Sequence, residues 1–174
     1  MKQELGTFTV STGTVTVTDP CYKKGTWCTA EVKNVVKGPW KAEVDVIDAG
    51  SWGNRVSSLI VHAVGSNRDT QVVKTARLPN DIGVDAGVCG VFEDKPDYTG
   101  DWLNVCDEMR AGYGGIASKH NAFRCEGAWS SSGYGDGGYD AYVGYNKDGE
   151  VVQIEIDYHV VEEDEDEEEE EDTY

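Results

Sequence analysis

The chain has 174 residues, and its 33 Asp and Glu against 15 Lys and Arg give a formal net charge of −18. This length suggests one domain, and a hydrophobic fraction of 39% is enough for one core. The negative charge disfavours direct binding to nucleic-acid phosphates and to anionic membranes, because the approach would be repulsive.

The first part of the chain contains several candidate strands. Thr7–Val10 and Thr14–Thr18 are rich in Thr and Val and are joined by Ser11–Gly13, so we predict a hairpin. A third strand is predicted over Trp27–Val32. Trp40–Val46 alternates strictly between apolar and charged residues, which predicts a strand with one buried face.

The middle of the chain combines strands with one helix. Val56–Val64 is more continuously apolar, and we predict a central strand buried on both faces. Gln71–Leu78 and Val84–Phe92 are further predicted strands. An amphipathic helix is predicted near residues 101–111, with Asp101 as its N-cap and apolar residues at positions i, i+3, i+4 and i+7.

The C-terminal part predicts a second hairpin. Asp140–Tyr145 and Glu150–Tyr158 flank the turn Asn146–Gly149, and His159 follows on the polar face, where we expect it to meet solvent. The predicted fold class is therefore mostly β, either all-β or α+β, built as an antiparallel sheet or sandwich with one helix.

The acidic charge is concentrated at the C-terminus, where every residue from Glu162 to Asp172 is acidic. Without this run of eleven, 22 acidic residues stand against 15 basic ones, a net charge of −7. A block of like charges without apolar residues cannot bury surface and repels itself. We predict a single β-rich domain over residues 1–161 and a disordered acidic tail over residues 162–174.

The cellular location follows from two expectations. The N-terminus lacks the apolar region of a signal peptide, and apolar stretches such as Leu59–Val61 are too short to span a bilayer. An odd number of cysteines fits free thiols in a reducing compartment; they are Cys21, Cys28, Cys89, Cys106 and Cys125. We therefore expect a cytoplasmic protein.

The most unusual segment runs from Ser130 to Asp140, where glycines alternate with Ser, Tyr and Asp. Glycine lets backbone amides approach a ligand closely, so Ser132, Asp136 and Tyr139 are candidates for binding a small polar ligand. The alternative is a hairpin loop whose glycines serve only the turn. No Gly-Lys-Ser/Thr follows, so this is not a phosphate-binding loop.

This segment also carries a resemblance to a known family. The run SSSGYGDGGYDAYVGYNKDGEVVQIEIDY, together with VDAGVCGVF from Val84 to Phe92, resembles an uncharacterised bacterial and phage domain family with VDxG and SGxGDGxY segments. The segments Asp19–Tyr22 and Ser51–Val56 are similar to small phage proteins that bear this domain. The resemblance spans most of residues 5–159 and implies a phage or prophage origin, and so the host cytoplasm. The family's function is unknown, so it implies no mechanism.

Other polar residues complete the candidate set. Asp19, held extended before a proline, starts a turn that places Cys21 at a strand end. A thiol there is a nucleophile only beside a base, and a small buried hydrophobe is the commoner role. Arg55 suits a ligand phosphate or an internal ion pair.

Asp85, Asp136 and Asp140 would hold a divalent cation if they converged, although Asp beside Gly more often caps a turn. No CxxC or HxxxH pair indicates zinc. We predict no catalytic residue and no metal site, and the cofactor stays unknown. The ligand-binding candidates are Asp19, Arg55, Asp85, Ser132, Asp136 and Tyr139.

Three functional hypotheses remain. The first is a non-enzymatic phage-type accessory protein that binds a small polar ligand, such as a host signalling nucleotide, through the Gly/Asp-rich loop. The second is an acidic interaction protein that inhibits a basic or nucleic-acid-binding host protein. The third, ranked last, is a hydrolase using Asp136 or Cys21, because no nucleophile–base pair stands at a recognisable spacing.

Overall fold

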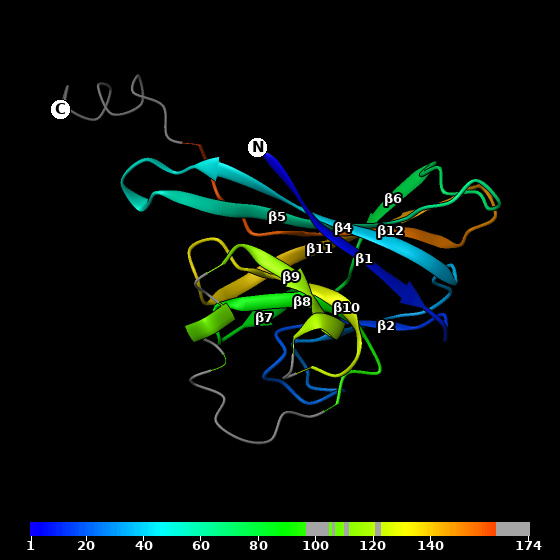
Figure 1. The fold of residues 1–174 in the computed structure, drawn as a ribbon, viewed down its shortest axis with the longest axis horizontal. Coiled ribbons are helices and arrows are strands. Elements are labelled where there is room, and N and C mark those ends of the chain that lie inside the picture. The colour runs from blue at the N-terminus through cyan, green and yellow to red at the C-terminus, as the bar shows by residue number, and fades with distance from the viewer. Residues whose placement is uncertain (97–104, 106, 110–111, 121–122, 163–174) are drawn as a thin grey trace.

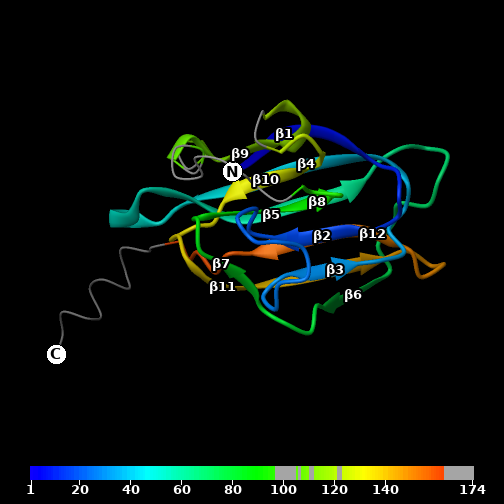
Figure 2. The same cartoon turned by 90° about the horizontal axis from the view of Figure 1, so that it is seen from below.

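The computed structural model describes residues 1–96, 105, 107–109, 112–120 and 123–162. Its strands form two antiparallel sheets that lie as two layers (Figures 1 and 2). The first sheet has the order β1-β4-β5-β12-β11-β6, with β7 also paired to β11, and the second has the order β3-β2-β8-β10-β9. The predicted mostly-β antiparallel fold is confirmed.

The strands of the first sheet are β1 (Lys2–Val10), β4 (Gly38–Asp48), β5 (Asn54–Ala63), β6 (Lys74–Arg77), β7 (Ile82–Val84), β11 (Gly137–Tyr145) and β12 (Val151–Asp157). Those of the second are β2 (Val15–Thr18), β3 (Ala30–Val32), β8 (Val88–Glu93), β9 (Gly114–Ile116) and β10 (Glu126–Ser131). Two 3-10 turns, η1 (Gly50–Trp52) and η2 (Ala117–Lys119), lie in loops.

The period-two sequence pattern decides which face of each strand is buried. Along β4, Trp40, Ala42, Val44 and Val46 point into the core, while the charged residues between them face outward. The β12 strand repeats this arrangement, with Ile154 among its buried side chains. Burial of such a side chain stabilises the fold by roughly 1.5–3 kcal/mol, so these alternations fix the register of the first sheet.

The predicted N-terminal hairpin is wrong, although both of its strands exist. The β1 strand pairs with β4 and the β2 strand pairs with β3 and β8, so the turn between them carries the chain from one sheet to the other. The buried carboxylate of Glu93 stabilises this turn by accepting hydrogen bonds from the backbone of Ser11 at 2.7 Å and of Thr12 at 3.0 Å. No local pattern reveals this crossing, because the stabilising group lies far away in the sequence.

The predicted strand over Val84–Phe92 is two strands, β7 and β8, in different sheets, separated by a turn at residues 85–87. The strand predicted from Trp27 begins only at Ala30, because hydrogen-bonded turns occupy the preceding residues. The β5 strand is central, as predicted, but alternates between buried and half-buried residues rather than being buried on both faces.

The short strands β9 and β10 are not predicted by the sequence, because both are built largely from glycine and other small residues. The predicted strand over Gln71–Leu78 is confirmed only as the shorter β6. The predicted helix near 101–111 lies largely outside the described residues, although Val105 and residues 107–109 are helical. Within the described part of the chain, no helix is long and apolar enough to cross a membrane.

The described cysteines, Cys21, Cys28, Cys89 and Cys125, carry thiols that form no disulfide. Cys28 and Cys89 are buried in the core. Burial raises the pKa of Cys89 well above its ordinary value, and the charge of Asp19 raises it further. Burial also raises the pKa of Cys125 to about 11. Since the thiolate is the reactive form, the thiols of Cys89 and Cys125 are unsuited to nucleophilic chemistry near neutral pH.

We expect Cys28 and Cys89 to resist alkylation in the native protein near pH 8, because they are buried and, at Cys89, the thiol stays protonated. The reaction of Cys125 should keep accelerating up to about pH 11. Iodoacetamide labelling with peptide mass spectrometry, in buffer and in denaturant, measures both rates. Equal labelling of Cys89 under the two conditions would contradict this assignment.

Candidate functional site

The Asp19 carboxylate is a structural brace at one end of the molecule. It is fully buried, and its Oδ1 accepts a hydrogen bond from the backbone N–H of Cys21 at 2.9 Å. Its Oδ2 accepts from the N–H groups of Asp85 at 2.8 Å and Ala86 at 2.7 Å. Both oxygens are thus engaged, and Asp19 joins its own turn to the turn between β7 and β8.

The Gly/Asp-rich loop between β10 and β11 is held by its own hydrogen bonds. The hydroxyl of Ser132 donates to the carbonyl of Gly135 at 2.8 Å, and the N–H of Gly135 donates back to the carbonyl of Ser132 at 3.1 Å. The buried hydroxyl of Tyr139 donates to the same two carbonyls. The N–H of Ser132 bonds to the carbonyl of Gly87 at 3.1 Å, which ties this loop to the turn that Asp19 braces.

Close packing requires at least one glycine of this loop. Gly133 has a φ of +66°, and a Cβ atom built there would lie 2.6 Å from the side chain of Val160 and 3.1 Å from the carbonyl oxygen of Val56. The loop therefore packs against the start of β5 and the segment after β12. At this position the glycine serves the turn, which is the alternative that the sequence left open.

Asp85 and Asp136 are the exposed carboxylates of this region. The pairing of β7 with β11 ends at Val84 opposite Gly137, so Asp85 and Asp136 are the next opposed positions. Burial, together with smaller contributions from the charges of Cys28 and Asp85, raises the pKa of Tyr22 to about 12. Asp85 therefore acts electrostatically on the Asp19–Tyr22 turn.

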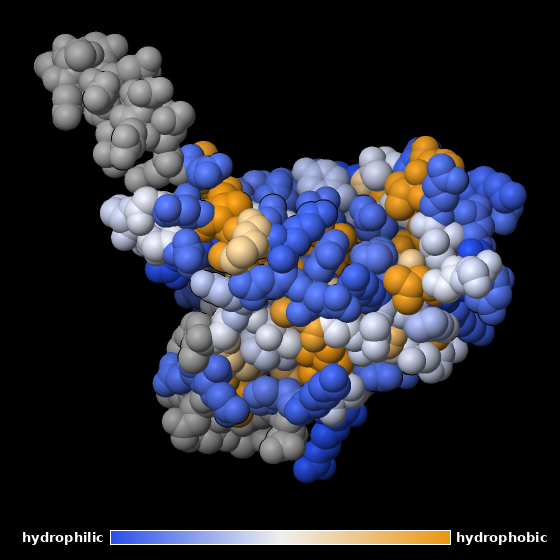
Figure 3. All heavy atoms as spheres, turned by 45° about the horizontal axis from the view of Figure 1, so that its top comes forward, coloured by the Kyte–Doolittle hydropathy of each residue, from blue (hydrophilic) through white to orange (hydrophobic). Residues whose placement is uncertain are grey.

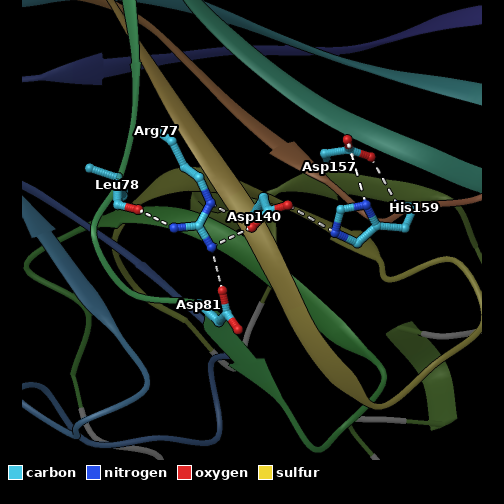
Figure 4. Close-up of polar contacts among 6 residues, drawn as sticks. All are labelled: Arg77, Leu78, Asp81, Asp140, Asp157 and His159. Atoms are coloured by element: carbon cyan, nitrogen blue, oxygen red, sulfur yellow. Dashed lines mark hydrogen bonds and ion pairs between the residues drawn. The ribbon is translucent and has the colours of Figure 1, made fainter.

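Asp140 belongs to a separate chain of polar contacts on the outer face of the first sheet (Figure 4). Its Oδ1 accepts from Arg77 Nε at 2.7 Å, and its Oδ2 lies 3.2 Å from His159 Nε2. Arg77 also bonds to Asp81 and to the carbonyl of Leu78. The hydrogen bond to Asp140 raises the pKa of the Arg77 guanidinium, against a smaller opposing effect of burial.

His159 lies at the other end of this chain, with Nδ1 3.8 Å from a carboxylate oxygen of Asp157. It is half exposed, as expected from its place on the polar face. Asp140 thus faces a cation and an imidazole instead of converging with Asp85 and Asp136. Within the described residues, no group of three or more His, Cys, Asp or Glu is placed to hold a metal ion.

The outer face of the first sheet is largely hydrophilic (Figure 3). Ion pairs cross its strands, including Lys41 with Glu4 at 3.5 Å and Lys2 with Glu43 at 3.8 Å. Burial raises the pKa of Glu155 on this face, with a further contribution from the charge of Asp157. The face therefore carries acidic residues at close spacing.

Arg55 lies near an exposed aromatic pair that the sequence analysis did not predict. Its Nε donates to the carbonyl of Trp52 at 2.8 Å, and it makes no ion pair with any described residue. The indole of Trp52, in the turn between β4 and β5, meets the ring of Tyr134 at 5.2 Å between centroids and an interplanar angle of 61°. Their side chains are 55% and 41% exposed.

The structure thus brings five of the six predicted residues into one region: Asp19, Asp85, Ser132, Asp136 and Tyr139. Asp19, Ser132 and Tyr139 stabilise the region from inside, whereas Asp85 and Asp136 face solvent. Arg55 reaches the same end through the contact of Trp52 with Tyr134. We name the exposed part, formed by Asp48, Trp52, Asp85, Tyr134 and Asp136, the aromatic–acidic end.

Replacement of Asp19 with Ala should destabilise the protein by about 3 kcal/mol, because it leaves three backbone N–H groups without their acceptor. Urea unfolding measures the loss. Asp48→Ala is the matched control, since Asp48 is exposed and accepts one hydrogen bond, from the N–H of Gly50. An unfolding midpoint for Asp19→Ala no lower than that of the control would show that the hydrogen bonds of Asp19 contribute nothing to stability.

Comparisons of the chain with protein-family models, with curated proteins and with solved structures found no match in any of the three.

Proposed function

We propose that the protein is a non-enzymatic interaction protein that binds a basic protein partner through its aromatic–acidic end. The observation that carries this proposal is the exposed contact between Trp52 and Tyr134. The turn of Trp52 also carries the exposed Asp48, the loop of Tyr134 carries the exposed Asp136, and Asp85 is the position opposed to Asp136. Two loops from different parts of the chain together hold these rings at the surface.

Exposed aromatic rings suit a protein interface. Trp and Tyr bury a large apolar area with few rotatable bonds, and they are enriched among the residues that dominate binding energy. The Tyr134 loop is held by the Ser132 and Tyr139 bonds, and Arg55 fixes the carbonyl of Trp52. The rings are therefore already positioned, and binding costs less ordering of the surface.

The charge distribution points to a basic partner. The chain carries a net charge of −18, and the acidic run from Glu162 begins two residues after Val160, whose side chain packs beside Gly133 of the Tyr134 loop. The acidic run is thus attached to the chain at the aromatic–acidic end. Carboxylates around an aromatic centre steer a cationic partner toward the surface and accelerate its association at low salt.

A small polar ligand in the Gly/Asp-rich loop receives less support from the geometry. The hydroxyls of Ser132 and Tyr139 and the carboxylate of Asp19 already make internal hydrogen bonds, which a ligand would have to break. The outward-facing groups are carboxylates and aromatic rings instead. The resemblance to small phage proteins makes basic host proteins the partners to test first.

The binding test uses two fluorescent peptides of equal charge, an oligolysine and a lysine-rich peptide containing Trp and Leu. We expect the protein to bind both, with affinity that falls as salt rises. The Trp52→Ala/Tyr134→Ala variant should weaken binding of the apolar-containing peptide roughly tenfold, about 1.4 kcal/mol. Asp85→Asn/Asp136→Asn should weaken binding of both peptides.

A truncated chain and a charge-control variant complete the peptide-binding test. A chain ending at Val161 should bind more slowly at low salt, because it lacks the acidic run. Asp148→Asn is a matched charge control in an exposed turn and should leave binding unchanged. Unchanged affinity in both double variants would rule out the aromatic–acidic end as the binding surface.

A further inference from the structure

A second exposed tryptophan, Trp27, stands in the loop between β2 and β3. Its side chain is 87% exposed, and it makes no ring contact with any described residue. An indole held in water costs free energy, since an apolar surface of this size is normally buried. The aromatic–acidic end does not include Trp27.

The loop holds Trp27 between two hydrogen-bonded turns. The N–H and the hydroxyl of Thr26 donate to the carbonyl of Lys23 at 3.2 and 2.7 Å. The N–H and the hydroxyl of Thr29 donate to the carbonyl of Thr26 at 3.0 and 2.8 Å. Each turn is thus closed twice, once by backbone and once by side chain, so the backbone that carries the indole is fixed.

The neighbouring residue anchors this loop to the core. Cys28 is buried, and its carbonyl accepts a hydrogen bond from the N–H of Gly83 at 2.9 Å. A Cβ atom at Gly83 would lie 2.7 Å from that of Cys28, so the two segments are in close contact. Asn80 bonds to the carbonyl of Thr29 at 3.1 Å. Trp27 therefore projects from a well-supported base.

A hollow of about 380 Å³ lies beside the indole. Besides Trp27, its lining includes Thr16 on β2, Lys24, Thr29 and Glu31 on β3. This volume lies within the range of small-molecule sites, which combine an apolar surface with a few polar groups. One aromatic face thus stands next to hydroxyl, ammonium and carboxylate groups.

The charge of residues 21–33 is opposite in sign to that of the whole chain. Residues 21–33 contain three lysines, Lys23, Lys24 and Lys33, and a single acidic residue, Glu31, in a chain of net charge −18. Glu31 lies 3.5 Å from the ammonium of Lys33 and 3.8 Å from that of Lys24. Lys23 makes no ion pair with any described residue. This segment keeps a positive charge that an anionic ligand would neutralise.

We propose that this loop binds a free nucleoside monophosphate, whose base stacks on Trp27 and whose phosphate is held by Lys23 and Lys24. Base stacking on an aromatic side chain tolerates every base, because each base has a π face. Thr16 and Glu31 line the hollow and carry polar groups suited to the sugar hydroxyls. The proposal is independent of the basic partner, because it uses other residues and the opposite charge.

The size of the ligand follows from the charge of the whole chain. A long nucleic-acid strand would meet the field of the −18 protein along its entire length, and that repulsion would oppose the few lysine contacts. A single phosphate experiences mainly the nearby lysines, because charges beyond about 8–10 Å are screened at moderate salt. The free nucleotide is therefore favoured over the polymer.

Calorimetric titration of the full chain tests the proposal with AMP, GMP, CMP and UMP as ligands. Adenosine and ribose phosphate serve as ligands lacking the phosphate and the base, and a thymidine oligonucleotide represents the polymer. We expect a monophosphate to bind more tightly than adenosine, ribose phosphate and the oligonucleotide. No binding of any monophosphate, or binding of the oligonucleotide alone, would overturn the proposal.

Variants locate the site. Trp27→Ala should weaken binding roughly tenfold or more, Trp27→Phe should weaken it less, and Lys23→Gln/Lys24→Gln should abolish the advantage of AMP over adenosine. Val73→Ala and Lys147→Gln are the controls, since each changes an exposed apolar or lysine side chain that belongs to neither proposed site. Equal affinity of Trp27→Ala and the wild-type protein, with unfolding midpoints unchanged, would place the ligand elsewhere.

Discussion

The bonding of the Asp19 carboxylate to three backbone N–H groups is the constraint on which this end of the molecule depends. It fixes the turn between β7 and β8. The carbonyl of Gly87 in that turn accepts a hydrogen bond from the N–H of Ser132. Ser132 in turn closes the loop that carries Tyr134 and Asp136. A buried charge thus sets, through successive hydrogen bonds, the position of side chains that face solvent. Removal of one partner of such a network leaves other buried groups unsatisfied, which makes the network cooperative.

Internal hydrogen bonding also explains why the residues that the sequence suggested for ligand binding are not the ones that the structure exposes. Serine, tyrosine and aspartate around glycines suggest a ligand site, but here the hydroxyls of Ser132 and Tyr139 satisfy carbonyls within their own loop. A loop with many glycines has few side chains to pack, so it needs such internal bonds to keep one conformation. The groups left for a partner are the rings of Trp52 and Tyr134 and the carboxylates beside them.

Periodicity in the sequence predicts the strands that bury one face, because the alternation of apolar and polar residues within such a strand determines which of its side chains are buried. Trp40–Val46 and Val152–Val160 alternate strictly, and the corresponding strands β4 and β12 adopt the expected faces. Periodicity does not predict pairing over long distances. The assignment of β1 and β2 to different sheets depends on Glu93, more than eighty residues away in the sequence. The β10 strand contains small residues that leave no pattern, and it is stabilised by pairing with β8 and β9.

The candidate site was likewise predictable only where it depends on local sequence patterns, and not where it depends on strand pairing. The Asn146–Gly149 turn predicts that β11 and β12 form a hairpin, but a register shift beside Tyr145 places Asp140 opposite Asp157, one residue beyond the partner that the Tyr145–Val151 register would give. The chain of contacts from Arg77 through Asp140 to His159 depends on this shift and on the pairing of β6 with β11. Trp27 gave no local sign of exposure, because it stands at the start of a predicted strand and tryptophan is highly buried on average.

The edges of the two sheets have a consequence for how copies of this chain meet one another. An open strand edge is a template for intermolecular pairing, and proteins protect it with short length, charge or irregularity. The edge strands β3 and β6 have three and four residues, and β6 carries Lys74 and Arg77. The longer β1 has a register break between Glu4 and Gly6, and its Thr9 N–H bonds to Glu126 on the other sheet. These edges offer little continuous ladder to a neighbouring molecule, so the protein is protected against edge-to-edge aggregation at high concentration.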